Sequence, residues 1–259
     1  MAWTERQQRM LAEMGLRVWV PPAREEVQEV VAEAPAIQAA PLRTPTAPGP
    51  APPARPAVED SGDRPRSAVA QLDWAALREA VAGCTACGLC QGRRQTVFGV
   101  GHERAQLMVV GEAPGEQEDL KGEPFVGPAG KLLDSMLRAI GMTREPAGPE
   151  QQVYIANTLK CRPPGNRNPQ PEELQRCEPY LQRQLALVQP KVILAMGRFA
   201  VQALLRSTDP IGRLRGRVHL YEGVPLVVTY HPAYLLRNLP DKARAWEDLC
   251  LAASLLRPA

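Results

Sequence analysis

The sequence lacks long apolar runs, has only 5% aromatic residues and contains only three histidines. No stretch of about 18 uncharged apolar residues occurs, which argues against a membrane-spanning helix. The first residues, MAWTERQQRM, carry charges of both signs and no apolar segment, so a secretory signal peptide is not expected. We therefore expect a cytoplasmic protein, whose cysteines bind metals or do chemistry more often than they form disulfides.

A large excess of charge of one sign is also missing. The formal net charge is +3, so a surface that binds nucleic acid would have to be a local basic patch. The pattern G-x4-G-K-[ST], which binds nucleotide phosphates in P-loop proteins, does not occur. No internal repeat is found either.

The composition divides the chain into three parts. Residues 21–67 hold 11 of the 27 prolines and almost no large apolar side chains, which predicts a disordered linker. Residues 1–20 form a short block with helical spacing of Met10, Leu11 and Met14. This block is either a frayed terminus or a docking peptide on a long tether. Residues 68–259 are expected to form the folded domain.

In that domain, short apolar runs alternate with segments of helical periodicity. The expected strands are Leu107–Val110, Val153–Ala156, Val192–Met196 and Leu226–Thr229. The expected helices are Lys131–Ile140, Pro179–Val188, a segment from Gly197 to about Arg206, and Asp241–Leu256. This alternation predicts an α/β fold with a mostly parallel sheet covered on both faces. Ligands bind beyond the carboxyl ends of such strands, which points to loops 111–119, 157–168 and 231–237.

Most of the cysteines are clustered in the sequence. Five of the six are Cys84, Cys87, Cys90, Cys161 and Cys177. A C-x2-C pair with two distant thiols suits tetrahedral metal binding, but spacing alone leaves the choice of ligands open because of Cys90. It also leaves open whether the metal is zinc or a [4Fe–4S] cluster. Cys250, between two leucines on the last expected helix, is expected to pack in the core.

The loop after the first expected strand contains Gly111, Glu112 and Gly115, followed by Glu118. A Gly–Pro–Gly turn at this place exposes backbone N–H groups, and a carboxylate there can orient a water or stabilise positive charge. The alternative is an ordinary loop with solvated acids.

Two other loops carry groups that suit a flat heterocycle. Phe125 is either a core residue or a stacking platform at the mouth of a pocket. Asn157 offers an acceptor and two donors to a pyrimidine edge, or else it caps a turn. The basic residues that follow it, Lys160, Arg162 and Arg167, are either phosphate contacts or a solvated basic loop.

The last loop begins with His231, directly after an apolar strand and before a proline. A neutral imidazole can donate a hydrogen bond to a developing oxyanion, although a lone histidine is often structural. Tyr234, Leu235 and Leu236 are candidates for an apolar wedge that enters a base stack, with Arg237 beside the backbone.

The domain closely resembles the family 4 uracil-DNA glycosylases in the motifs GEAPGEQED, GEPFVGPAGKLLDSML, NTLKCRPPGNRNPQP and HPAYLLRN. The resemblance runs from about Leu77 to the C-terminus. It implies a three-layer α/β/α fold and a [4Fe–4S] cluster, whereas the cysteine spacing alone leaves zinc as the alternative metal. The implied metal ligands are Cys84, Cys87, Cys161 and Cys177.

The resemblance also implies roles for the candidate residues in excising uracil from DNA. Glu112 would face the sugar and the attacking water, Asn157 would read the Watson–Crick edge, and His231 would hydrogen-bond uracil O2. The implied substrate contacts are Gly111, Glu118, Phe125, Asn157 and His231. The implied DNA contacts are Arg162, Arg167, Tyr234, Leu235, Leu236 and Arg237. Segment 158–168 has no histidine, unlike a related branch that forms covalent adducts with DNA.

Residues 5–20, ERQQRMLAEMGLRVWV, resemble the N-terminal peptide of the psi subunit of the bacterial replicase clamp loader, which suggests a replisome partner bound through residues 4–20. We expect a monomeric, nucleoid-associated enzyme. Two alternatives are a non-catalytic iron–sulfur or zinc module that binds nucleic acid, and a replisome accessory protein that uses this fold as a scaffold.

Overall fold

The computed structural model describes residues 66–257. The docking peptide expected in residues 1–20 lies outside the described residues, as does the linker expected in 21–67 except for its last two residues. Those two begin helix α2 (Arg66–Val69). The first described helix thus starts two residues before the expected boundary at residue 68.

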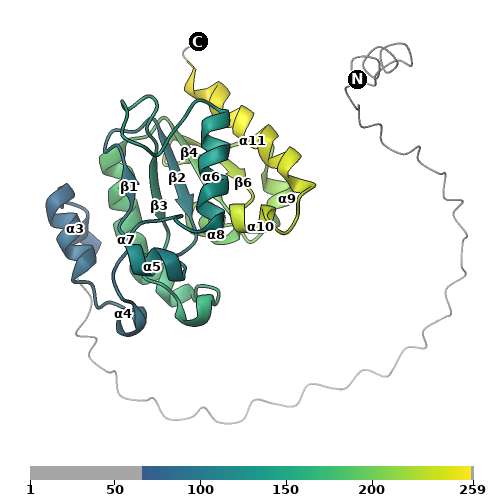
Figure 1. The fold of residues 1–259 in the computed structure, drawn as a ribbon. Helices are drawn as coiled ribbons and strands as arrows, with labels where there is room; N and C mark the ends of the chain where they lie inside the picture. Colours follow the sequence, from purple (N-terminus) through teal and green to yellow (C-terminus); the bar gives the residue numbers. More distant parts are fainter. Residues whose placement is uncertain (1–65, 258–259) are drawn as a thin grey trace, which may run out of the picture. The chain divides into compact units, whose positions relative to one another are not determined.

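A six-stranded sheet with the order β1-β3-β2-β4-β6-β5 forms the centre of the described part of the chain (Figure 1). The strands are β1 (Val100–Gly101), β2 (Leu107–Gly111), β3 (Tyr154–Asn157), β4 (Val192–Met196), β5 (Val218–Tyr221) and β6 (Val224–Thr229). The four inner strands are parallel, whereas β1 and β5 pair antiparallel with their neighbours. This confirms the expected mostly parallel sheet, and it brings the carboxyl ends of four strands to one edge.

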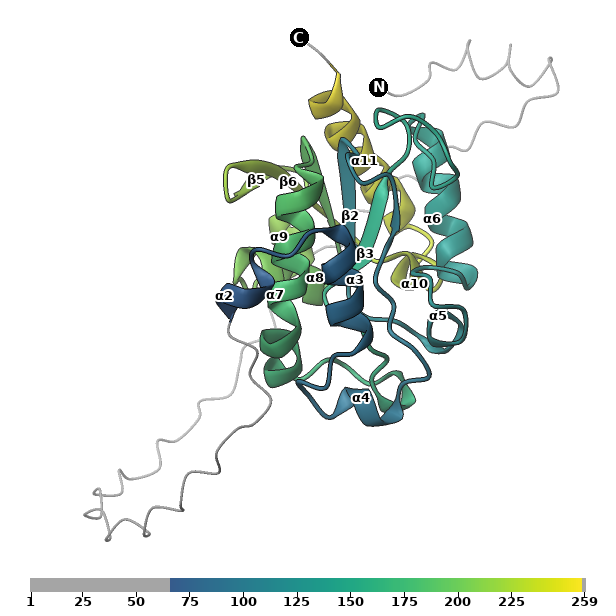
Figure 2. The same ribbon diagram turned by 90° about the vertical axis from the view of Figure 1, so that its left-hand side faces the viewer.

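Helices cover both faces of the sheet, as the side view shows (Figure 2). One face carries α6 (Pro128–Ala139), α10 (Pro232–Leu235) and α11 (Asp241–Leu256), and the other carries α7 (Pro171–Val188), α8 (Arg198–Leu205) and α9 (Ile211–Leu214). Along β2, Leu107 and Val109 face the first layer while Met108 and Val110 face the second, because strand side chains alternate. The three-layer α/β/α architecture is therefore confirmed.

Shorter helices surround the cysteine-rich segment. They are α3 (Trp74–Ala82), α4 (Leu89–Gly92), α5 (Glu116–Lys121) and the 3-10 turn η1 (Pro164–Asn166). Helix α3 begins after Asp73, whose carboxylate accepts a hydrogen bond from the Ala76 N–H at 2.9 Å. Buried side chains of α2 and α3 pack against Tyr180 of α7. This packing fixes the segment that leads into Cys84.

The two edge strands were not predicted. β1 has only two residues, and β5 exposes alternate side chains, with Leu220 67% exposed. β5 and β6 are joined at Glu222 and Gly223, which have φ values of 47° and 83° and therefore form a tight hairpin turn. Short, half-exposed strands carry too few apolar residues to stand out in the sequence.

Two expectations about helices were wrong. Helix α7 begins at Pro171, not Pro179, because Gln170 and Glu173 form a capping box there and the helix continues through Pro179. Cys250 is exposed and not in the core. Helix α11 turns Ala245, Leu249 and Ala252 toward the sheet, and the residue after Leu249 points about 100° away from that face.

Within residues 66–257, no helix combines the length and apolarity needed to cross a lipid bilayer.

Candidate active site

A cleft of about 1020 Å³ lies at the carboxyl ends of the parallel strands. Its lining includes residues from all three loops picked out in the sequence, namely Glu112, Gly115, Glu118, Asn157, Arg167, His231, Tyr234 and Arg237. The start of α8 and the segment from Thr208 to Gly212 also line the cleft, and the sequence had not pointed to either. The rule that ligands bind at this edge of a parallel sheet therefore located the cleft correctly.

Gly111 lies where the candidate base-binding side chains converge. It pairs with Asn157 across the β2–β3 ladder. A Cβ atom on Gly111 would lie 2.4 Å from the Asn157 side-chain oxygen and 2.6 Å from the Phe125 ring. Any larger residue at 111 would therefore displace one of these two groups.

Asn157 is 2% exposed, yet its Oδ1 has no hydrogen-bond partner among the described residues. Its backbone carbonyl accepts a hydrogen bond from Lys160 Nζ at 2.8 Å. Buried polar atoms are almost always paired in native proteins, because an unpaired one loses its hydration without compensation. The orphaned acceptor therefore indicates a ligand that supplies an N–H or O–H donor.

Phe125 and His231 form one wall of the cleft. Their rings stack with centroids 5.3 Å apart and an interplanar angle of 26°. Phe125 has a φ of 56°, a left-handed conformation that is rare for an aromatic residue, and its backbone rests on Gly130 of α6, where a Cβ would lie 1.7 Å from the Phe125 carbonyl oxygen. Such local strain is typical of residues that the surrounding fold holds in a functional position.

His231 is positioned as a neutral hydrogen-bond donor. Its Nδ1 accepts a hydrogen bond from the Ala233 N–H at 3.2 Å, which leaves the proton of the neutral ring on Nε2. Burial lowers the pKa of His231 to about 4, with Glu118 opposing this change and Arg237 adding to it. Behind the ring, Gly197 has a φ of 89°, and a Cβ there would lie 3.1 Å from the His231 Cβ.

Glu112 is half-buried at the start of the loop after β2. Burial raises the pKa of its carboxyl group, and the nearby Arg198 opposes the shift. The backbone carbonyl of Glu112 accepts hydrogen bonds from the Leu159 N–H at 3.1 Å and from the Thr158 hydroxyl. These bonds attach the Glu112 loop to the Asn157 loop, so the two side chains enter the cleft from a shared support.

Glu118 lines the cleft, but backbone donors engage both of its carboxylate oxygens. Oε2 accepts from the Gly115 N–H at 3.1 Å, and Oε1 accepts from the N–H groups of Val126 and Gly127 at 3.0 and 3.3 Å. Glu118 therefore ties the Glu112 loop to the Phe125 loop. The contact with substrate that the sequence predicted for Glu118 would have to use the same two carboxylate oxygens that hold these loops together.

The basic residues after Asn157 differ from expectation. Lys160 is 1% exposed and faces the interior, so the phosphate contact expected of it is wrong. Arg167 forms a two-pronged ion pair with Glu173, and Arg162 donates to the Asn166 side chain at 2.8 Å. The side chains of both arginines are therefore bound by other protein groups, an amide and a carboxylate. The sequence of the loop could not reveal the ion pair, because Glu173 belongs to the next helix. The contact of Arg162 and Arg167 with DNA stays a prediction.

The expected apolar wedge also needs a correction. Leu235 is 1% exposed and packs in the core, because α10 is a single turn that must bury one side chain against α6. Tyr234, Leu236 and Leu239 are 36%, 43% and 62% exposed. Tyr234 and Arg237 line the cleft, and Leu236 and Leu239 are exposed apolar side chains close to them in the sequence.

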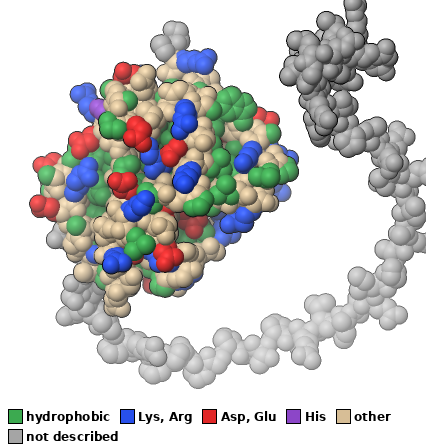
Figure 3. All heavy atoms as spheres, viewed as in Figure 1, with side chains coloured by type: hydrophobic (Ala, Val, Ile, Leu, Met, Phe, Trp, Pro, Cys, Tyr) green, Lys and Arg blue, Asp and Glu red, His purple; other side chains and the backbone are tan. Residues whose placement is uncertain are grey.

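The surface charges agree with the small net charge of the chain. Acidic and basic side chains are interspersed over the face seen in Figure 3, and neither sign dominates it. Two basic residues, Arg198 and Arg237, line the cleft, where they would attract a polyanion.

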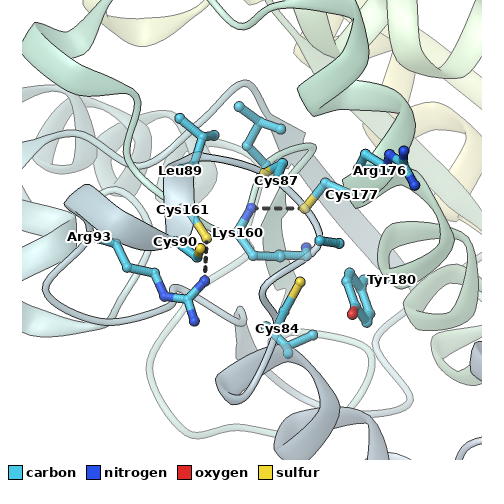
Figure 4. Close-up of a pocket in the computed structure, with 13 residues that line it drawn as sticks. Cys84, Cys87, Leu89, Cys90, Arg93, Lys160, Cys161, Arg176, Cys177 and Tyr180 are labelled. Carbon is cyan, nitrogen blue, oxygen red and sulfur yellow. Dashed lines mark hydrogen bonds between the residues drawn. The ribbon is translucent and has the colours of Figure 1, made fainter. Parts of the chain in front are cut away.

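The cysteines converge on a second, much smaller cavity (Figure 4). Its lining includes Cys84, Cys87, Cys90, Cys161 and Cys177. They come from the loop after α3, from α4, from the loop after β3 and from α7, so the fold gathers thiols that are up to 93 residues apart in the sequence.

The cavity is lined by thiols, the donor type that zinc and iron–sulfur centres use. Burial raises the pKa of Cys177 to about 12 and also raises the pKa values of Cys161 and Cys87, so the thiols would ionise readily only beside a cation. Arg93 donates to Cys161 Sγ at 3.1 Å, and the Lys160 N–H donates to Cys177 Sγ at 3.3 Å. Between residues 66 and 257, no three Cys, His, Asp or Glu side chains lie close enough together to hold a metal ion in this arrangement.

The comparison with known proteins shows the family of the chain. The profile of the Uracil DNA glycosylase superfamily matches residues 98–250. This chain belongs to that superfamily. The type-4 uracil-DNA glycosylase of Archaeoglobus fulgidus is 48% identical over 164 residues, covering 60% of this chain and 79% of that protein.

Two further type-4 uracil-DNA glycosylases are similar over more of the chain. The protein of Sulfurisphaera tokodaii is 42% identical over 181 residues, which is 66% of this chain and 79% of that protein. The protein of Thermotoga maritima is 40% identical over 185 residues, which is 70% of this chain and 93% of that protein. The resemblance to family 4 seen in the motifs is therefore confirmed.

The lowered pKa of His231 gives a direct test of the burial of its ring in the cleft wall. We expect its ring to titrate near pH 4 instead of near 6.5, in NMR spectra assigned with a His231→Asn variant. Since the unfolded chain takes up this proton at higher pH than the folded one, the contribution of His231 to stability is complete above about pH 6.5 and falls as the pH drops to about 4. Titration near 6.5 would show that the ring is not enclosed as described.

Proposed function

We propose that this protein removes uracil from DNA by hydrolysing the N-glycosidic bond and leaving an abasic site. The orphaned, buried Oδ1 of Asn157 is the observation that carries this proposal. Uracil has an N–H donor at N3, which this acceptor can bind, whereas cytosine has an unprotonated nitrogen there. The site thus favours the deaminated base over the normal one.

Before reaction, the nucleotide must leave the duplex to enter the cleft. The Phe125 ring would then stack on the flipped base, and Asn157 would read its Watson–Crick edge. Gly111 leaves room for the Asn157 amide and the Phe125 ring to come close together, so that both can meet the base. Gly111 and Asn157 end the paired strands β2 and β3, and Phe125 lies in the loop between α5 and α6, so a complete recognition site depends on the folded sheet edge.

Bond cleavage leaves negative charge on the base and positive charge on the sugar. His231 would donate its Nε2–H to uracil O2 as charge accumulates there, and a neutral donor is available because its pKa is about 4. The Glu112 carboxylate would face the sugar, where it stabilises the cation and orients the attacking water. Glu118 would keep the loops of Glu112 and Phe125 together while the base is bound.

For contact with DNA, we propose that Leu236 enters the base stack from the minor groove, with Tyr234 beside it. The exposed Leu239 would contact DNA in the role that the sequence suggested for Leu235, which is buried. The Tyr234 ring is held by stacking on Tyr230 at 5.1 Å and by a hydrogen bond from its hydroxyl to Asp241 at 2.7 Å. Arg237 and the Arg162–Arg167 loop would contact phosphates. The enzyme would work as a monomer on the DNA of the nucleoid.

The first test is an assay for abasic sites in uracil-containing DNA with the full-length protein. We expect His231→Ala and Asn157→Ala each to lower single-turnover excision by about 100- to 1000-fold, because each removes a bond to the leaving base. His102→Ala, at the opposite end of β2 from the cleft, is the matched control and should keep full activity. Absence of abasic product with folded, metal-containing protein would refute the proposal.

We propose further that Cys84, Cys87, Cys161 and Cys177 hold a [4Fe–4S] cluster, with zinc as the alternative. When bound, the cluster supplies a cross-link between chain segments and no redox step, since hydrolysis transfers no electrons. The four thiols line one small cavity, and cationic Arg93 donates to Cys161 Sγ, which supports this assignment. The family of the chain is consistent with it.

Metal analysis of the purified protein tests the cofactor. We expect a brown protein with iron and inorganic sulfide, and a loss of iron in Cys84→Ala because a ligand is removed. Cys250→Ala is the control, since this thiol is exposed on the opposite helical layer. A colourless protein that contains zinc would exclude the cluster while keeping the site.

We also propose that residues 4–20 dock on a clamp-loader subunit, which would carry the enzyme with the replisome. This proposal depends on the sequence of that segment alone. The proline-rich stretch behind it would act as a spacer that raises the local concentration of the enzyme.

A pull-down with full-length protein and with a chain that starts at Ala68 tests the tether. We expect clamp-loader subunits to be recovered only with the full-length protein, because the shorter chain lacks the docking residues. Both proteins should excise uracil equally in the absence of partners. Equal recovery of clamp-loader subunits would contradict the proposal.

A further inference from the structure

Lys160 lies between the two cavities of the domain. Its side chain is 1% exposed, and the residue lies three positions after Asn157 and directly before Cys161. Burying an ammonium group is costly unless its donors are paired, so a buried lysine needs a specific set of partners. Those partners connect the cysteine cavity to the uracil-binding loop.

The Lys160 ammonium has two well-defined acceptors. Nζ donates to the Asn157 backbone carbonyl at 2.8 Å and to the Gln184 side-chain oxygen at 2.6 Å. Both bonds lie within the core and are shielded from water. The first of them holds the backbone of the residue that carries the orphaned acceptor.

Gln184 is itself fixed in orientation. It is fully buried on α7, and its Nε2 donates to the Phe98 carbonyl at 2.9 Å and to the Tyr154 hydroxyl at 3.1 Å. Because both amide hydrogens are engaged, its oxygen is turned toward Lys160. The ammonium group is therefore held from α7 and from the strand below it.

The backbone of Lys160 completes the link. Its N–H donates to Cys177 Sγ at 3.3 Å, and its carbonyl accepts from the Val97 N–H at 2.8 Å. Figure 4 shows the lysine side chain passing beside the thiols of the cavity. One residue thus contacts a candidate metal ligand through its backbone and the base-reading residue through its side chain.

We infer that Lys160 is a positioning residue, which rests on the proposed function of Asn157. It holds the Asn157 backbone so that Oδ1 meets uracil N3–H, and it ties that position to the cysteine cavity. A lysine fits this role because its long stem reaches across the core, and because its ammonium can donate to two acceptors at once. Lys160 would not contact the substrate itself.

The experiment is a double-mutant cycle in the full-length, metal-containing protein. Lys160→Met keeps the length of the side chain but removes its donors, and Lys131→Met on the exposed surface of α6 is the matched control. We expect Lys160→Met to lower single-turnover excision of uracil by about 10- to 100-fold, since small misplacements of a binding group cost this much. Iron content and the visible spectrum should stay as in the unaltered protein.

Comparing the effect of Lys160→Met in the unaltered protein and in Asn157→Ala distinguishes a positioning role from general stabilisation. If Lys160 acts through Asn157, Lys160→Met should lower the rate less than about threefold when Asn157 is already alanine. The same loss in both backgrounds, or no loss in either, would overturn the inference. Gln184→Leu leaves Lys160 and all cysteines in place, and it should show the same dependence on Asn157 if Lys160→Met does not fold.

A failure of the proposed function can be distinguished from a failure of the positioning role of Lys160. Absence of uracil excision by the unaltered protein would refute that function, and crystal structures would then judge the inference alone. We expect the Asn157 carbonyl to move in Lys160→Met and to stay in place in Lys131→Met. An unmoved Asn157 in Lys160→Met would overturn the positioning role.

Discussion

The close packing of Asn157 and Phe125 over Gly111 is the contact on which the candidate site depends. Gly111 and Asn157 are paired in the parallel ladder at the carboxyl ends of β2 and β3, so the sheet register sets their separation. The missing side chain at 111 leaves space for the Asn157 amide and the Phe125 ring. His231 then stacks on Phe125 from the end of β6. Displacing any one of these groups would disturb the others.

The cysteine segment supports the same arrangement from behind. The Asp119 carboxylate of α5 accepts from the Arg94 N–H at 3.0 Å, which fastens the chain after the C-x2-C pair to the helix that follows the Glu112 loop. Lys160 makes the corresponding link to Asn157. A metal in the cysteine cavity would therefore stabilise the positions of the Glu112 and Asn157 loops without reaching the cleft.

The inner strands, the three loops and the cleft were predictable from the sequence, because continuous apolar runs and strand-end polar residues are local signals. The burial of Lys160 and Leu235 and the pairing of Arg167 with Glu173 were not predictable. Each depends on which neighbour the fold brings close, and sequence spacing holds no such information. The start of α8 was missed as a cleft wall for the same reason. The uracil substrate itself followed from family resemblance, since spacing alone names no base.

We propose that the orphaned Asn157 oxygen recognises the N3–H of uracil. Inhibition of the glycosylase reaction by free uracil and by free 3-methyluracil measures this contact most directly, since the two bases differ at the one atom that the oxygen would contact. We predict that uracil inhibits and that 3-methyluracil does not, and that Asn157→Ala abolishes this difference. Equal inhibition by the two bases would contradict the account.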